Sequence, residues 1–377
     1  MPASAGWTTR VCLAVALLCL LAVSVSVGAS AATVRGSQAD PAAGLHAAGA
    51  TTAAAAGAGW IARDLSSNGA LVDAISKRPS AADTADAILA LVAAGEGSLQ
   101  VKAATHWLEH NFSSYVSAKG VDNPGALGLV TLAAVAADAD PAHFGGRAGA
   151  NDLVKRLEVT EHLVGRDAGI FGAKKSANAF NQALALLALV AVRAPDRETR
   201  LAEGYLARRQ CADGGYDYSL ATPCAKPDPK TYVGPDTNST ALVVMAIVAA
   251  GGHFGHSPVA FFKRSQESDA SFGYYGVAGE GQRGDPDSTG EVVQALIALG
   301  VVGESQFVRR GITPERALES FQFRCGAPTT ERGELSYFGA PSQYATLQAV
   351  PALAGVALPV KPRKLSASEF RFSCGAS

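Results

Sequence analysis

The sequence predicts an all-α protein, an α6/α6 toroid built from six helical hairpins. Two observations carry this prediction. Six apolar segments recur along the chain, beginning near residues 83, 123, 178, 236, 287 and 342. Most are introduced by Asp, Asn or Ser and several end at Gly, which are the residues that cap and stop helices. Amphipathic segments that carry the charges alternate with them.

The apolar segments are hydrophobic on nearly every side, so each is expected to be buried by several neighbours. An open stack of such units needs polar caps at both ends, and neither end unit is unusually polar. A closed ring is therefore favoured. The outer, amphipathic segments share a pair of large side chains at a fixed place, namely Trp60-Ile61, Trp107-Leu108, Tyr205-Leu206 and Phe261-Phe262.

The composition narrows the classes of function. The 377 residues include 32 basic and 33 acidic side chains, and 48% are hydrophobic while 17% are charged. This balance provides no excess of positive charge that would attract nucleic acid or an anionic membrane, so we expect no nucleic-acid partner. The low charge and high apolar content also argue against a disordered chain.

The N-terminal segment has the pattern of a secretory signal peptide, residues 1–31. Arg10 precedes an apolar run over residues 11–27, and Ala29-Ser30-Ala31 offers a cleavage site. Cleavage is favoured over retention as a membrane anchor because the run is borderline in length for a span. We therefore predict a secreted, extracellular protein with no stable membrane span after cleavage.

The remaining chain divides into three parts. Residues 32–57 are rich in Ala, Gly and Thr without a patterned apolar face, and they are predicted to form a flexible leader. Residues 58–357 contain the six hairpins and form the toroid domain. Residues 358–377 form a C-terminal tail.

The cysteines predict two disulfides. Two of the six cysteines lie in the signal segment, which leaves an even number in an exported chain. The favoured pairing is Cys211 with Cys224, and Cys325 with Cys374, which would tie the tail to the last hairpin. A zinc site built on these cysteines is disfavoured because no C-x-x-C spacing occurs.

Two histidines have a spacing that can hold a metal. His106 and His110 are four residues apart on an outer helix. No third ligand has a recognisable place beside them, so we interpret them as surface residues. The sequence thus predicts no metal site and no cofactor.

Two loops carry residues that resemble a known repeat. Gln210 is followed by Asp213-Gly-Gly-Tyr216, and Gln266 by Asp269-Ala-Ser-Phe272. This pattern resembles the QW-type repeat of squalene and hopene cyclases, and the Asp-Thr-x-x-Thr-Ala helix start at 236–241 resembles protein prenyltransferase β-subunits. The resemblance covers residues 58–355, is strongest in the fourth and fifth hairpins, and implies the toroid of the terpenoid cyclase and protein prenyltransferase superfamily. It implies no activity by itself.

The same resemblance offers candidate catalytic residues. Class II terpene cyclases protonate an alkene with an Asp in a D-x-D-D-T motif, and Asp285-Pro-Asp-Ser-Thr289 matches it at two aspartates. This implies Asp287 as the acid, supported by Asp285, although Ser288 replaces the last aspartate. The favoured interpretation is that Asp287 caps its helix, as Asp83 and Asp236 do in theirs.

The loops that enter the inner helices hold aromatic and acidic side chains. In a toroid these loops gather at one end, where such residues suit a sugar, a lipid head or a peptide. Packing within the repeat explains the aromatics equally well. The candidate ligand-binding residues are Tyr216, Tyr218, Asp236, Tyr274, Tyr275, Tyr337 and Tyr344. Candidates for the two carboxyl groups of a glycosidase are Asp213, Asp236, Asp285, Asp287 and Glu291.

We therefore expect a secreted toroid that binds an extracellular small molecule, lipid, glycan or protein without catalysis. One alternative is a terpene-cyclase-like enzyme with Asp287 as its general acid. The other is a carbohydrate-active toroid that uses two of the carboxyl groups.

Overall fold

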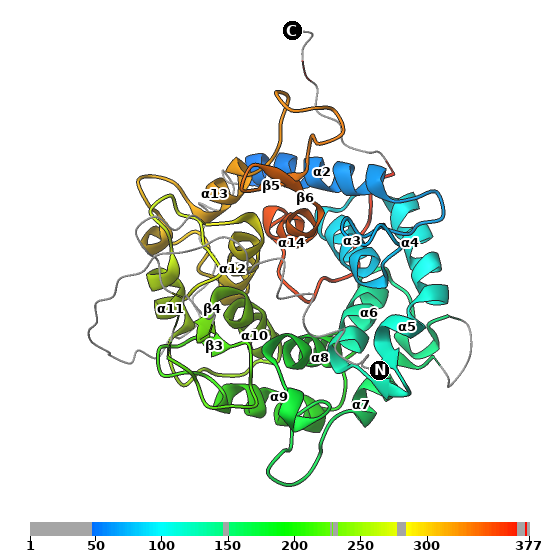
Figure 1. The fold of residues 1–377 in the computed structure, drawn as a ribbon, viewed down its shortest axis with the longest axis vertical. Coiled ribbons are helices and arrows are strands. Elements are labelled where there is room, and N and C mark those ends of the chain that lie inside the picture. The colour runs from blue at the N-terminus through cyan, green and yellow to red at the C-terminus, as the bar shows by residue number, and fades with distance from the viewer. Residues whose placement is uncertain are drawn as a thin grey trace, which may run out of the picture.

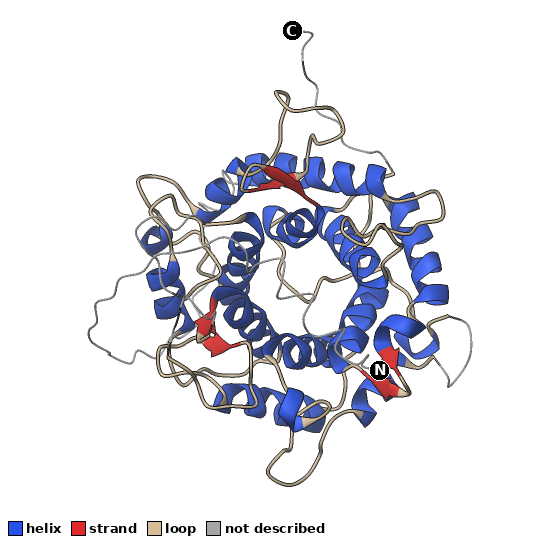
Figure 2. Ribbon diagram, in the orientation of Figure 1, coloured by secondary structure: helices blue, strands red, loops and turns tan. Residues whose placement is uncertain are grey.

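The computed structural model describes residues 47–145, 151–226, 228, 233–276, 284–367 and 374. These residues form two concentric rings of helices (Figure 1 and Figure 2). The inner ring contains α3 (Ala81–Ala94), α6 (Pro124–Ala136), α8 (Ala179–Ala191), α10 (Thr237–Ala249), α12 (Pro286–Leu299) and α14 (Gln343–Leu353). The outer ring contains α2 (Ala47–Asp64), α4 (Ser98–Asn111), α7 (Leu153–Val159), α9 (Asp196–Arg208), α11 (Pro258–Ser265) and α13 (Pro314–Ser320). The predicted signal peptide lies outside the described residues.

Short elements complete the chain between these helices. Helix α5 (Ser113–Val116) follows α4, and three 3-10 helices lie at Pro141–His143, Lys174–Ser176 and Ser305–Phe307. Three antiparallel two-stranded sheets pair β1 (Ser117–Ala118) with β2 (Val121–Asp122), β3 (Tyr216–Asp217) with β4 (Pro235–Asp236), and β5 (Leu335–Tyr337) with β6 (Ala340–Ser342). Within the described chain, no helix is long and apolar enough to span a bilayer.

The ring is closed, as the sequence predicts. Each inner helix contacts the next one, and α14 returns to contact α3. Helix α2 lies across this junction and contacts both α14 and α3. The all-α, α/α toroid prediction is therefore confirmed.

Helix α2 corrects the predicted leader. Residues 47–57 belong to this helix, and Ala53 to Ala58 include side chains that are almost fully buried. The composition was misleading because a helix rich in Ala and Gly shows little amphipathic pattern while Ala favours the helix strongly. Small residues also let α2 approach α14 closely, since a Cβ on Gly57 would clash with the side chain of Val350.

Polar caps start all six inner helices, but two lie elsewhere than predicted. Helix α3 is capped by Ser80, and helix α12 by Asp285, whose Oδ1 accepts the Ser288 amide at 2.8 Å. Asp83 and Asp287 instead lie inside the first turn. Proline suits the first helical position, so Pro286 places the cap at Asp285. The six cap residues are Ser80, Asn123, Asn178, Asp236, Asp285 and Ser342.

Glutamine side chains join hairpins that follow one another around the ring. The side-chain amide of Gln266 donates to the carbonyl oxygens of Ala270 and Phe307, at 3.1 and 2.6 Å. The first acceptor belongs to its own entry loop and the second to the next unit. Gln210 makes the equivalent pair of hydrogen bonds.

Gln322 makes the hydrogen bonds that close the ring. Its side-chain amide donates to the carbonyl of Gly333 at 3.0 Å and to that of Ala53 in α2 at 2.9 Å. The second bond joins the sixth hairpin to the first. Gly333 has a φ of 99°, and a Cβ there would clash with the Ala56 carbonyl, so glycine is required for this approach.

The entry loops are also fixed to their own inner helices. In five hairpins a buried loop amide donates to a side chain four residues after the helix cap. The donor and acceptor pairs are Leu71 and Thr84, Phe171 and Gln182, Tyr216 and Thr240, Phe272 and Thr289, and Leu335 and Thr346. Buried amides are costly to leave unpaired, so this bond fixes where each loop turns into the ring.

Neighbouring entry loops contact one another. Asp236 and Tyr275 form a backbone bridge between the fourth and fifth loops. The side-chain amide of Gln343 donates to the carbonyl of Val72 at 3.1 Å, which joins the sixth loop to the first. The loops therefore gather at one end of the ring, as expected.

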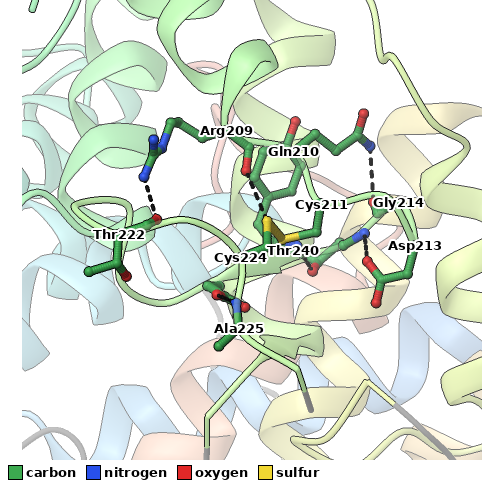
Figure 3. Close-up of a disulfide and its surroundings, with 12 residues drawn as sticks. Arg209, Gln210, Cys211, Asp213, Gly214, Thr222, Cys224, Ala225 and Thr240 are labelled. Atoms are coloured by element: carbon green, nitrogen blue, oxygen red, sulfur yellow. Dashed lines mark hydrogen bonds between the residues drawn. A yellow bond between two sulfur atoms is a disulfide. The ribbon is translucent and has the colours of Figure 1, made fainter.

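Both predicted disulfides are confirmed. Cys211 and Cys224 are joined across a separation of 13 residues, next to the Gln210 hydrogen bond (Figure 3). Cys325 and Cys374 are joined across 49 residues and tie the C-terminal tail to the last hairpin.

Replacing Gln322 by Met should destabilise the protein by about 1–3 kcal/mol, because two buried carbonyls lose their donor. The matched variant Gln210→Met should cost less, since its acceptors are partly exposed and water replaces the amide. Urea denaturation followed by circular dichroism measures both. Equal losses in the two variants would contradict a ring closed by Gln322.

Removing each disulfide as a Cys→Ala pair should lower stability in the order of the loop lengths. Chain entropy gives about 3 kcal/mol for Cys211 with Cys224, and about 4 kcal/mol for Cys325 with Cys374. Equilibrium denaturation of the two double variants measures this difference. The reverse order would show that the tail contributes little.

Candidate functional site

A cluster of polar side chains lies on the inner face of three adjacent helices, α12, α14 and α3. In α14 the side chain of Val350 faces the outer helix α2. Gln348 is two residues earlier, about 200° around the helix, so it faces into the ring. Tyr344 lies one turn before Gln348 on the same side. Counted from the helix caps, Glu291 and Asp86 occupy the register of Gln348.

The second position after the cap also carries a polar side chain in α12 and in α14. Asp287 on α12 has the register of Tyr344 on α14, and Asp287 is 4% exposed. Tyr344 is the accessible member of the cluster, with 43% of its surface exposed. Ring closure between α14 and α3 then brings Asp86 to the same sector.

The carboxyl groups in this sector hold their protons strongly. Burial, together with the nearby charges of Asp86 and Asp287, raises the pKa of Glu291 to about 8. Burial, followed by the charge of Asp83, raises the pKa of Asp86 to about 8 as well. At pH 7 these shifts favour the protonated forms of Glu291 and Asp86.

Four buried oxygens in this sector have no donor among the described residues. They are Asp287 Oδ1, Glu291 Oε2, Gln294 Oε1 and Gln348 Oε1. The side-chain amide of Gln294 has one hydrogen bond, because its nitrogen donates to the main-chain carbonyl oxygen of Gln348 at 3.0 Å. The Asp287, Gln294 and Gln348 atoms are hydrogen-bond acceptors, and the protonated Glu291 carboxyl can accept or donate. Each unmet buried polar atom costs about 1–3 kcal/mol. The sector is thus suited to a partner that supplies donors.

Asp285 and Asp287 form a hydrogen-bonded carboxyl pair. Burial raises the pKa of Asp285 well above its usual range, and the adjacent charge of Asp287 and the hydrogen bond between them raise it further. Asp285 thus donates its proton toward Asp287. Its Oδ1 accepts the Ser288 amide and so caps α12. Its role in the fold is to start the helix, which leaves Asp287 to face the ring.

The predicted aromatic residues do not form a single site. Tyr216 is fully buried in the main core, and its amide donates to Thr240 at 2.9 Å, so it is not accessible to a ligand. Tyr337 packs edge-on against Phe338, with ring centroids 4.6 Å apart, in the β5–β6 turn.

The remaining aromatic residues line the entry loops of the fourth and fifth hairpins. Tyr218 packs against Phe180 on α8, and Tyr274 packs against Tyr275, each pair with centroids 5.8 Å apart. Asp236 caps α10. Burial raises its pKa to about 7, although hydrogen bonds from Ser239 and Tyr274 oppose this shift.

Three members of the inner cluster were not predicted from the sequence. Asp86, Gln294 and Gln348 are isolated polar residues within apolar segments. Aligning the helices by their caps places Asp86, Glu291 and Gln348 six residues after the cap, which is the signal that could have found them. Asp213 has a local role because its Oδ1 accepts the Gly215 amide at 3.0 Å.

Comparisons with known proteins support the fold. No family model matches the chain, and no curated protein is similar to it by sequence. An α-1,6-mannanase of Salegentibacter, solved as an inactive variant with α-1,6-mannotriose, superposes with a TM-score of 0.54 and 10% identity, over 81% of this chain and 98% of that one. The type II terpene cyclase MstE from Scytonema, solved with geranylgeranyl dihydroxybenzoate, gives 0.52 and 12%, over 82% and 98%.

The chain spans about half the length of a third structure, ent-copalyl diphosphate synthase from Streptomyces platensis. That match has a TM-score of 0.43 and 19% identity, over 74% of this chain and 51% of the synthase. The protein therefore has the α/α-toroid fold that glycosidases and terpene cyclases share. At these identities the similarity shows the fold alone.

Stability should fall as the pH rises from about 4.5 to about 8. Over this range the unfolded chain ionises Glu291 while the folded protein keeps it protonated, so the folded state binds more protons. The variant Glu291→Gln should remove up to about 1.4 kcal/mol per pH unit of this slope. Urea midpoints measured at several pH values test it, and an unchanged slope in the variant would contradict a buried, neutral Glu291.

Proposed function

We propose that the protein binds a neutral, hydroxylated small molecule, such as a sugar or the end of a glycan, on the inner face of α12, α14 and α3. The observation that carries the proposal is the set of four oxygens on two neighbouring helices that no group in the described part of the chain pairs with. Hydroxyl groups supply donors to such oxygens and can also accept from the protonated carboxyl groups beside them. The accessible ring of Tyr344 offers an apolar surface next to these groups.

The charge state of the cluster favours a neutral ligand over a cation. Glu291 and Asp86 hold their protons at pH 7, so a cationic ligand would have to displace protons before it gained ion pairs. A hydrocarbon chain offers no donor and would leave all four acceptors unmet. Hydroxyl-bearing ligands therefore fit the sector better than amines or isoprenoids.

A secreted location fits the same proposal. Two disulfides are typical of an oxidising compartment, and the chain begins with the pattern of a signal peptide. The mannanase shares the toroid fold and was solved with a mannose trisaccharide, which makes an oligosaccharide a reasonable first ligand to test.

Glycoside hydrolysis is a second candidate function, favoured by one observation. Glu291 is a neutral carboxylic acid at pH 7, which is the form a general acid needs, and Asp287 lies one turn before it. The cyclase alternative rests on the Asp285 and Asp287 pair, in which Asp285 is already engaged in capping α12. We propose binding without catalysis because the unpaired acceptors call only for a bound donor.

Isothermal titration with neutral trisaccharides, including α-1,6-mannotriose, should detect binding at pH 6.5. Glu291→Leu should weaken it at least about tenfold, equivalent to 1.4 kcal/mol, because the hydrogen-bonding group is lost. Glu291→Gln keeps a polar group of the same shape and should retain most of the affinity. Product analysis after long incubation should show no cleavage with either the natural protein or Glu291→Gln.

The control variant is Glu161→Gln. Glu161 is also a buried acid, and burial is the main cause that raises its pKa to about 8. It lies in the entry loop after α7, where its main chain forms a β-bridge with Phe171. It should leave sugar binding unchanged. Binding of geranylgeranyl diphosphate in place of every sugar would overturn the proposed ligand class. Turnover of a trisaccharide that Glu291→Gln abolishes would establish the hydrolase instead.

A further inference from the structure

We propose that the outer helix α4 carries a zinc site formed by His106, Glu109 and His110, separate from the inner cluster. The ligand atoms of these three side chains all lie within 4.8 Å of one another. They come from positions i, i+3 and i+4 of a 14-residue helix, which place them on one face. The sequence alone shows the two histidines, but the helical register adds Glu109 as the third ligand.

The ring of His110 is already oriented for coordination. Its Nδ1 lies 2.8 Å from the carbonyl oxygen of His106, and because a carbonyl only accepts, this nitrogen carries the proton. In the neutral ring the lone pair is then on Nε2, which is free to bind a metal. Metal-binding histidines commonly donate their other N–H to a carbonyl or carboxylate in this way, which fixes the ring and its tautomer.

The other two ligands lie close by on the same face. His106 Nδ1 is 3.7 Å from Glu109 Oε2, and the two imidazole rings have centroids 4.6 Å apart. Two ligands of a tetrahedral zinc ion at about 2.0–2.1 Å lie roughly 3.3 Å apart, so the side chains need only small rotations. These rotations are open to them because the side chain of His106 is 75% exposed and that of Glu109 is 30% exposed.

The position at the end of α4 also favours a cation. His110 is in the last turn of the helix, where the unpaired carbonyls give the helix its negative end. Two imidazoles and one carboxylate are a ligand set typical of zinc, and hard cations such as Ca²⁺ and Mg²⁺ prefer oxygen ligands alone. Three protein ligands leave a fourth position for water or for a donor from another molecule.

A bound ion would link two successive turns of α4. The metal would join residue 106 to residues 109 and 110 and so oppose fraying at this end of the helix. Because zinc binds the folded helix and not the separated ligands of the unfolded chain, it should raise the melting temperature, and this rise should continue with the logarithm of the free zinc concentration above the Kd.

Equilibrium dialysis of the untagged, disulfide-bonded protein against ZnCl₂ at pH 7.5 tests the site. We expect one saturable equivalent that His106→Ala or His110→Ala weakens at least about tenfold, and Glu109→Gln by a smaller factor. Excess Mg²⁺ should not compete. The natural protein, but not these variants, should show a melting temperature that rises with zinc.

The matched control replaces His253 and His256 by Ala, since this pair lies in the turn before α11 and forms no such cluster among the described residues. It should keep the natural zinc affinity. Circular dichroism confirms that each variant folds, as expected for exposed side chains. The proposal is overturned if the natural protein binds no zinc, or if the His106→Ala, His110→Ala double variant binds it as tightly as the natural protein does.

Discussion

The structure depends on a glutamine amide that satisfies two carbonyl oxygens at once. Gln210, Gln266 and Gln322 each join their own entry loop to the following unit, and Gln322 makes this bond to α2 at the start of the ring. The carbonyls bound by Gln266 and Gln322 are buried and need a donor, so these two hairpins depend on a neighbour, whereas those bound by Gln210 are partly exposed. A single closed ring meets this requirement without capping units, since the sixth hairpin takes the first as its neighbour. The same geometry requires a left-handed backbone at Gly333, which packs against α2.

Ring closure also creates the candidate site. The caps and the loop amides fix where each inner helix begins, so residues two and six positions after each cap face inward together. Helices α6 and α8 have no polar side chain at these positions, and α10 has one, Asn238. Helices α12 and α14 are polar at both positions, and α3 adds Asp86. Burial keeps Glu291 and Asp86 protonated, which makes the sector rich in hydrogen-bonding groups without making it highly charged. The gathering of several unpaired acceptors on neighbouring inner helices, beside the exposed ring of Tyr344, is the reason to expect a ligand there.

Much of the fold could be predicted from the sequence because the repeat is local. Apolar segments with polar caps reveal the inner helices, and the cysteine count reveals the disulfides. The predicted leader and two predicted helix caps were wrong, because the local sequence pattern there does not reflect how the segment packs. Helix α2 resembles a linker in composition, and Pro286 moves the helix cap from Asp287 to Asp285. Gln322 could not be recognised from the pattern because Ala317 lies where four of the other hairpins have an aromatic residue. The inner cluster was only partly predictable, since Asp86 and Gln348 are far apart in the chain and meet only when the ring closes.

The most direct test of this account is a crystal structure of the secreted protein with a bound trisaccharide. The account predicts ligand hydroxyls within hydrogen-bond distance of Asp287 Oδ1 and Glu291 Oε2, with the Tyr344 ring against the sugar. A ligand bound elsewhere, or an inner face in which these oxygens are paired only with protein groups, would contradict the central claim that the ring holds its acceptors open for a hydroxylated ligand.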